Sequence, residues 1–124
     1  NITPIGHLPT ADHNAFNCSA QAVLNVNRDS MARYGFSPAT RVFEAAGAAA
    51  CLLTDPWQGL DTFFTPGEEI LVAENGETVA RILETLTPQT AQAIGQAARQ
   101  KVLTHHTYQQ RALLWTTKVG QVSR

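Results

Sequence analysis

Short apolar runs alternate with longer helical segments along this chain, and this alternation constrains the fold more than any other feature. Residues 22–27 form one such run, apolar on both faces up to Leu24, and residues 50–53 form another. A strand that is buried on both faces is typical of a parallel sheet covered by helices. Short connections between alternating strands and helices favour right-handed crossovers. The sequence therefore predicts an α/β fold with a partial Rossmann-like parallel sheet.

The pattern predicts about four strands with flanking helices and a helical C-terminus, all within a single domain over residues 1–124. The expected strands are residues 1–8, 22–27, 50–53 and 69–73. The expected helices are residues 12–20, 38–48, 60–64, 77–86, 88–105 and 107–119. Residues 28–36 are expected to be irregular, because they mix polar side chains with Gly35.

Helix starts are marked by capping side chains. Ser37-Pro38 and Thr87-Pro88 each combine a capping hydroxyl with a proline at the first helical position. Thr107 can cap the last helix in the same way. We expect that helix to bury one side, formed by Leu113, Leu114 and Trp115.

Composition and charge exclude several classes of partner. The formal net charge of -1 provides no basic face for a nucleic-acid backbone and no polybasic arm for a membrane. No apolar run reaches the length of about 18 residues that a membrane span needs, and no signal peptide opens the chain. Cys18 and Cys51 are too few for a disulfide framework and lie among apolar residues, which predicts reduced core thiols. These features predict a cytoplasmic location.

Polar residues follow the predicted strands at their carboxyl ends, which is where parallel α/β sheets bind ligands. Asn25, Asn27 and Arg28 stand at the end of the strand at residues 22–27. They are candidate ligand contacts, although asparagines that only cap a loop are equally consistent with the pattern. Asp55 is either part of the same edge or a turn residue before Pro56.

Other classes of site are disfavoured by the motifs. His105 and His106 are adjacent, so they do not share a helix face, and no Cys, Asp or Glu stands at ligand spacing; no metal site is expected. The chain has no GxSxG, Walker-type or GxGxxG motif. A receiver-like signalling domain would need acidic residues at the end of the first strand, where this chain has Ile5-Gly6-His7.

Several segments together resemble a glycosyltransferase family. Residues 41–46 (RVFEAA), followed by residues 50–55 (ACLLTD), are similar to the donor-binding core of GT-B glycosyltransferases. Residues 24–28 (LNVNR), 35–38 (GFSP) and 106–111 (HTYQQR) stand in the order found in the branch typified by spore-maturation proteins of the CgeB type. The resemblance spans residues 6–115.

This resemblance implies that the chain binds a nucleotide-diphosphate sugar as the donor for glycosyl transfer. Glu44 matches the glutamate that accepts hydrogen bonds from the ribose hydroxyls, a role that suits an acceptor-only carboxylate. The N–H groups around Ser37, Ala39 and Thr40, at the start of the helix, would face the diphosphate or the sugar. Arg41 is either a phosphate ligand or the partner of a carboxylate, and an Arg41–Glu44 ion pair on a solvated helix face is the alternative for both residues.

Phe36 departs from the family pattern, because it stands where the family has the first of two paired acidic residues. A phenylalanine cannot hydrogen-bond to sugar hydroxyls. A non-catalytic α/β binding or scaffold module derived from a glycosyltransferase is therefore the alternative function.

The resemblance also implies that an N-terminal domain of the same protein, which would supply the acceptor side, is missing from this chain. We therefore expect the chain alone to be inactive and assign no catalytic residue. No metal or other cofactor is expected, since helix dipoles and basic side chains can stabilise the leaving diphosphate. An incomplete sheet would expose an apolar edge, so we expect either self-association or displacement of the first strand.

Overall fold

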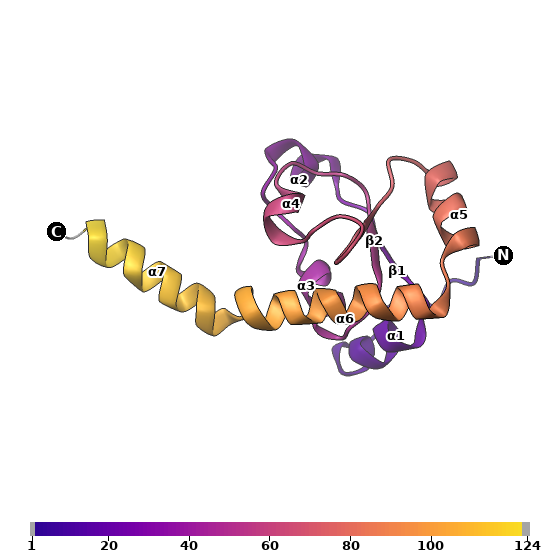
Figure 1. The fold of residues 1–124 in the computed structure, drawn as a ribbon, viewed down its shortest axis with the longest axis horizontal. Helices are drawn as coiled ribbons and strands as arrows, with labels where there is room; N and C mark the ends of the chain where they lie inside the picture. The colour runs from indigo at the N-terminus through magenta and orange to yellow at the C-terminus, as the bar shows by residue number, and fades with distance from the viewer. Residues whose placement is uncertain (1, 123–124) are drawn as a thin grey trace.

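The computed structural model describes residues 2–122 and has an α/β fold, in which a small sheet lies among helices and a C-terminal helix projects from the body (Figure 1). The elements in chain order are the short 3₁₀ helix η1 (Thr10–Asp12), α1 (His13–Ser19), β1 (Val23–Asn25), α2 (Asp29–Tyr34), α3 (Thr40–Gly47), β2 (Leu52–Thr54), α4 (Leu60–Phe63), β3 (Leu71–Val72), α5 (Gly76–Thr85), α6 (Pro88–His105) and α7 (Tyr108–Val122). The predicted fold class is confirmed.

The sheet contains three parallel strands in the order β1-β2-β3. Val23 lies opposite Leu52, and Leu53 lies opposite Leu71. The three inner strands of the prediction are therefore confirmed in shortened form. Because each connection between them carries helices, the carboxyl ends of all three strands meet at one edge of the sheet.

The fourth predicted strand, at residues 1–8, is wrong. Asn1 lies outside the described residues, and residues 2–8 contain no strand. Ile2 and Ile5, its expected apolar residues, are exposed. A strand is stable only beside a neighbour, and β1 pairs only with β2 among the described residues. The segment instead runs past the open side of β1.

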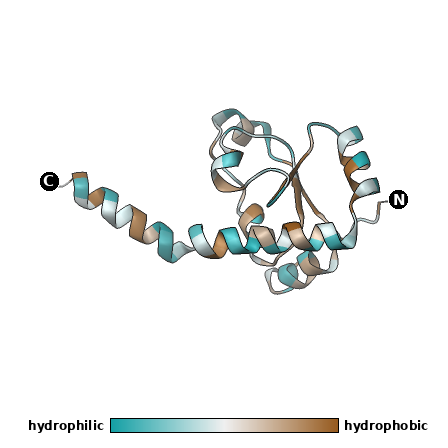
Figure 2. Cartoon of the chain, in the orientation of Figure 1, coloured by the Kyte–Doolittle hydropathy of each residue, from teal (hydrophilic) through white to brown (hydrophobic). Residues whose placement is uncertain are grey.

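The core lies between the sheet and the helices α3 and α6. Helix α3 buries Val42, Ala45 and Ala46, and α6 packs across it through Ala98. The strands are among the most apolar segments of the chain (Figure 2). Leu24 departs from the prediction of a strand buried on both faces, because its side chain is exposed on the open strand β1.

Helix starts were predicted correctly only where no long-range contact competes. Thr87 caps α6 by accepting from the N–H of Thr90 at 3.1 Å. Thr107 and Gln110 form a reciprocal capping box at α7, each side chain bonding to the other residue's backbone N–H. The predicted start at Ser37-Pro38 is wrong, because α3 begins at Thr40 and its N-cap is Ala39, without a side-chain cap.

Residues 28–36 were predicted to be irregular, and this is also wrong, since they contain α2. Asp29 in its first turn and Arg33 in its last turn both suit the helix dipole. Gly35, with φ +63°, ends the helix. The Phe36 N–H then donates to the Gln58 carbonyl at 2.7 Å, which holds the following residues against the loop after β2. This bond explains why the next helix starts late.

The predicted buried side of the last helix is wrong as well. Leu113, Leu114 and Trp115 are all exposed on α7, which points away from the body (Figure 1). Its contact with the body lies at its start, where the Arg111 guanidinium lies 5.1 Å from the centre of the Phe43 ring. Within residues 2–122, no helix has the length and apolar character needed to cross a membrane.

Candidate functional site

A polar network joins the carboxyl ends of β1 and β2. The Asn25 amide donates to the Thr54 hydroxyl at 3.1 Å, and that hydroxyl donates to Asp55 Oδ1 at 3.2 Å. Asn27 donates to the same Asp55 oxygen twice, from its backbone N–H at 3.1 Å and from its amide at 3.0 Å. Parallel pairing places Asn25 beside Thr54, so the register itself builds the network.

The network divides the three candidates at this edge by their access to a ligand. Asn25 is 1% exposed, so it does not reach a ligand directly. It holds the Thr54 hydroxyl in place from the buried side. Asn27 is half-buried, and Arg28 is exposed at the N-cap of α2. Asp55 is a hub that accepts three hydrogen bonds and is therefore more than a turn residue.

The start of α3 lies at this same edge, because a right-handed crossover from β1 to β2 runs back along the sheet. Ser37 and Thr40 are exposed there, while Ala39 packs against the core. The first N–H groups of a helix have no acceptor within the helix. They give this end of α3 a partial positive charge that can face an anion.

Arg41 and Glu44 line a cavity with a volume of about 610 Å³. It lies between α3, the open strand β1, and the segment from residue 5 to α1. Its size is within the range of about 300–1,000 Å³ typical of small-molecule sites. The remaining lining residues are Ile5, Gly6, His7, Leu8, His13, Phe16, Asn17, Ala20, Ala22, Val23 and Leu24. The other candidates, Asn25, Asn27, Arg28, Ser37, Ala39 and Thr40, are not part of this lining.

Glu44 has an ionic neighbour that the sequence did not indicate. His13 Nδ1 lies 3.8 Å from Glu44 Oε2, whereas an Arg41–Glu44 ion pair is not among those formed by residues 2–122. His13 is fixed in turn, because its Nε2–H donates to the Leu8 carbonyl at 3.1 Å. No spacing rule links residues 13 and 44, since only the fold brings α1 beside α3. His7 lines the same cavity.

A second cavity, of about 440 Å³, adjoins the first, because Asn17 and Ala20 line both. Cys18 and Cys51 both line it, and neither forms a disulfide. Cys51 is a core thiol as predicted, and burial raises its pKa. Cys18 is exposed, so the prediction of a buried thiol is wrong there. This cavity lies beside the amino ends of β1 and β2 and contains no acidic or basic side chain, so it is the weaker candidate for an anionic ligand.

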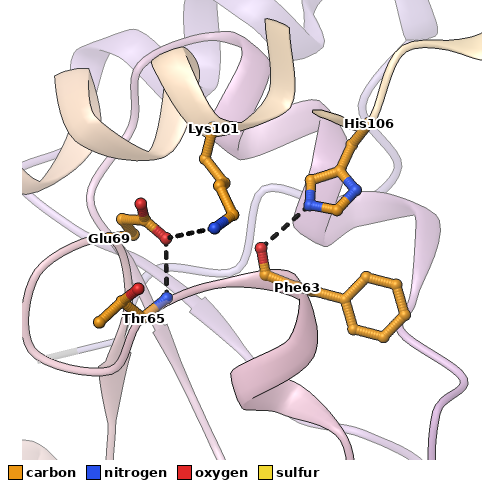
Figure 3. Close-up of polar contacts among 5 residues, drawn as sticks. All are labelled: Phe63, Thr65, Glu69, Lys101 and His106. Atoms are coloured by element: carbon orange, nitrogen blue, oxygen red, sulfur yellow. Dashed lines mark hydrogen bonds and ion pairs between the residues drawn. The ribbon is translucent and has the colours of Figure 1, made fainter. Parts of the chain in front are cut away.

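The junction between α6 and α7 has a structural role. His106 Nε2–H donates to the Phe63 carbonyl at 3.0 Å (Figure 3). The His106 ring packs among the rings of Phe43, Phe63 and Phe64. Burial lowers the pKa of His106, and the positive charges of Arg111 and Lys101 lower it further. Nearby, Glu69 bridges Lys101, at 3.9 Å, and the Thr65 N–H, at 2.7 Å. The segment 106–111 therefore fastens α7 to the body.

Metal ligation has no counterpart in the described part of the chain, where no three His, Cys, Asp or Glu side chains are grouped to hold an ion. The polar groups gather instead in two places, at the carboxyl edge of the sheet and in the cavity beside β1. Helix α3 connects these two places, because it starts at the carboxyl edge of the sheet and its residue Glu44 lines the cavity.

A family model described as glycosyl transferase-like matches residues 1–116. Neither the curated proteins nor the solved structures compared with the chain include a match. The predicted resemblance to glycosyltransferases is confirmed at this level, and assignment to the branch of the CgeB type stays a prediction. Because the match covers nearly the whole sequence, the chain belongs to the glycosyl transferase-like family.

Proposed function

We propose that this chain is the donor-binding part of a GT-B glycosyltransferase of the CgeB-type branch, which holds a nucleotide-diphosphate sugar during transfer to an acceptor. The observation that carries the proposal is the position of Glu44 and Arg41, one turn apart on α3 and facing a cavity of about 610 Å³. Family membership supports the class of protein, and these residues support the donor.

Glu44 is the acceptor for the ribose in this proposal. Its carboxylate can accept hydrogen bonds from both hydroxyls of a cis-diol. His13 lies close enough to Glu44 to orient it, and His13 is itself tied to the Leu8 carbonyl. Apolar side chains such as Leu8 and Phe16 line the same cavity and suit the flat face of a nucleobase.

The diphosphate is assigned to the start of α3. N–H groups around Ser37, Ala39 and Thr40 provide neutral donors with the favourable helix dipole. The Arg41 guanidinium can add a charge-assisted contact to phosphate oxygens. Because the chain has a net charge of -1, such placed groups must hold the anion without a general positive field.

Asn27 and Arg28 complete the donor side in this proposal. Arg28 is an exposed cation at the carboxyl edge of the sheet, and Asn27 presents an amide fixed by Asp55. Asn25 supports both from the buried side of the network through Thr54. Helix dipoles and basic side chains stabilise the leaving nucleotide, so no metal or other cofactor is part of the proposal.

The acceptor and the general base are assigned to an N-terminal domain of the same protein, so the chain alone is expected to be inactive. A cytoplasmic location belongs to the same proposal and agrees with two thiols that form no disulfide. Phe36 supports the alternative of a non-catalytic binding or scaffold module, because an acidic contact to the sugar is absent at that position. Transfer of sugar by the purified chain would contradict the expected inactivity.

Amide chemical shifts of the labelled 124-residue chain, titrated with UDP and with GDP, test donor binding. Shifts are expected around His13, Arg41 and Glu44 and at the start of α3, and Glu44→Ala should remove them. Glu84→Ala is the matched control, because Glu84 is exposed on α5 and does not line the cavity. If neither nucleotide causes shifts at millimolar concentration, the chain is not a donor site.

A further inference from the structure

Phe36 has a backbone conformation that a bulky side chain rarely adopts. Its φ is +49°, in the left-handed region. For residues other than glycine, asparagine and aspartate this region is uncommon, and for a large side chain it is an outlier. Such conformations persist only where the surroundings over-determine them, and they cluster at ligand sites.

Two contacts hold Phe36 in this conformation. Its N–H donates to the Gln58 carbonyl at 2.7 Å. Gly35, at φ +63°, packs so closely that a Cβ there would lie 2.9 Å from the Gln58 Cβ. The segment before α3 is therefore locked to the loop after β2, the same loop that begins with Asp55 of the polar network.

The Phe36 ring rests on a second glycine. A Cβ on Gly59 would overlap Cδ1 of the Phe36 ring and lie 2.8 Å from its Cγ. Only a residue without a side chain allows the ring to sit there. Phe36 nevertheless stays 57% exposed, so the chain fixes an aromatic ring at the surface instead of burying it. A fixed ring loses little conformational entropy when a ligand binds, which is the advantage of preorganisation.

The position of Phe36 relative to the proposed donor indicates which ligand group it meets. A nucleotide sugar contains, in order, the base, the ribose, the diphosphate and the sugar. Glu44, proposed to bind the ribose, lies one turn into α3, and the diphosphate is assigned to the start of that helix. Phe36 precedes that start in the chain and lies against the loop after β2, whereas Glu44 lines the cavity beside β1. In the order of the donor, the group after the diphosphate is the sugar.

We propose that Phe36 is a stacking platform for the sugar ring of the donor, and this inference rests on the proposed function. One face of a glucose-type hexopyranose presents C–H groups, which pack against an aromatic ring, where an acidic residue would have bound hydroxyls. The platform therefore selects donors by the apolar face of their sugar. Gly59 is a positioning residue, because its lack of a Cβ lets the Phe36 ring lie directly against the backbone there.

Binding of UDP and UDP-glucose, and of GDP and GDP-glucose, to the full 124-residue chain tests this role. In the wild type, the nucleotide sugar should bind about 2- to 10-fold more tightly than its nucleotide, the range expected for one aromatic contact. Phe36→Ala and Phe36→Leu should abolish that difference and leave nucleotide affinity unchanged. Phe36→Tyr should keep it. Leucine is the matched control for apolar bulk without a ring.

The outcomes separate this inference from the donor site itself. Nucleotide binding with no gain from the sugar in the wild type overturns the platform and leaves the donor site intact. Equal loss of nucleotide and nucleotide-sugar affinity in Phe36→Ala overturns it too, because the ring is then structural. No binding of any of the four compounds overturns both proposals. Amide spectra verify that each variant is folded. They are compared outside the segment before α3 and the loop after β2, where the substitution itself shifts the signals.

Discussion

Replacing Gly95 with alanine tests how closely α6 packs on the turn between α3 and β2. Gly95 is a buried residue of α6. A Cβ on it would overlap the Ala49 carbonyl oxygen and lie 2.8 Å from the Ala49 carbonyl carbon and 3.1 Å from that of Ala50. All of these are backbone atoms, so no side-chain rotation can relieve the overlap. Ala49 is itself held at φ +60°, which leaves the turn little freedom to move.

Two effects of opposite sign set the magnitude. Alanine is a better helix former than glycine by about 1 kcal/mol in a helix interior. Overpacking a tight core costs about 1–3 kcal/mol, and a clash with backbone belongs at the upper end. The net expectation for Gly95→Ala is a loss of about 2 kcal/mol in the free energy of unfolding. For a small domain this lowers the urea midpoint by about 1 to 2 M.

Urea unfolding followed by far-ultraviolet circular dichroism measures the effect. Gly47→Ala is the matched control, because Gly47 is an exposed residue at the end of α3 with nothing within 4 Å of an added Cβ. It should be neutral or stabilise by up to about 1 kcal/mol. Equal midpoints for Gly95→Ala and the wild type would show that α6 does not approach the turn this closely.

The remaining predictions concern pH and association. The unfolded state binds a proton at His106 more readily than the folded state, because the folded pKa lies below its ordinary value of 6.5. Stability should therefore fall as pH drops below about 6.5. In His106→Phe, the urea midpoint should depend less on pH across that range. If the midpoint of this variant falls with pH as steeply as that of the wild type, the assignment to His106 is refuted. The open edge of β1, with Leu24 exposed, should allow self-association. Light scattering should show a mass that rises with concentration and that Leu24→Lys suppresses, whereas a constant monomer mass in the wild type would rule this interface out.

The sequence predicted the structure correctly where the deciding contact joins residues that are close together in the chain. Thr87-Pro88 predicted the start of α6 correctly, because its cap lies within the first turn. The helix expected at residues 77–86 is α5, and the Asn75 side chain caps it by accepting from the Thr78 N–H. The inner strands were found for a related reason, since a run of buried apolar residues has few other places in an α/β fold.

Signals failed where a distant segment decides the outcome. Ser37 looked like a cap, but the preceding residue, Phe36, is held in the left-handed region by its bond to Gln58 in the loop after β2. The last helix has apolar residues such as Trp115, yet periodicity does not tell whether another segment covers them. In the candidate site, Glu44 was found through its motif, whereas His13 is invisible to any spacing argument because only tertiary packing brings it near.

The two tryptophans stand in opposite surroundings, which gives the molecule two separate optical reporters. Trp57 is 9% exposed, packs 5.8 Å from the Phe63 ring, and its indole N–H has no hydrogen-bond partner among residues 2–122. Trp115 is 71% exposed on α7. A dry indole emits at shorter wavelength than a hydrated one. Fluorescence can therefore follow the body through the blue part of the emission and the projecting helix through the red part.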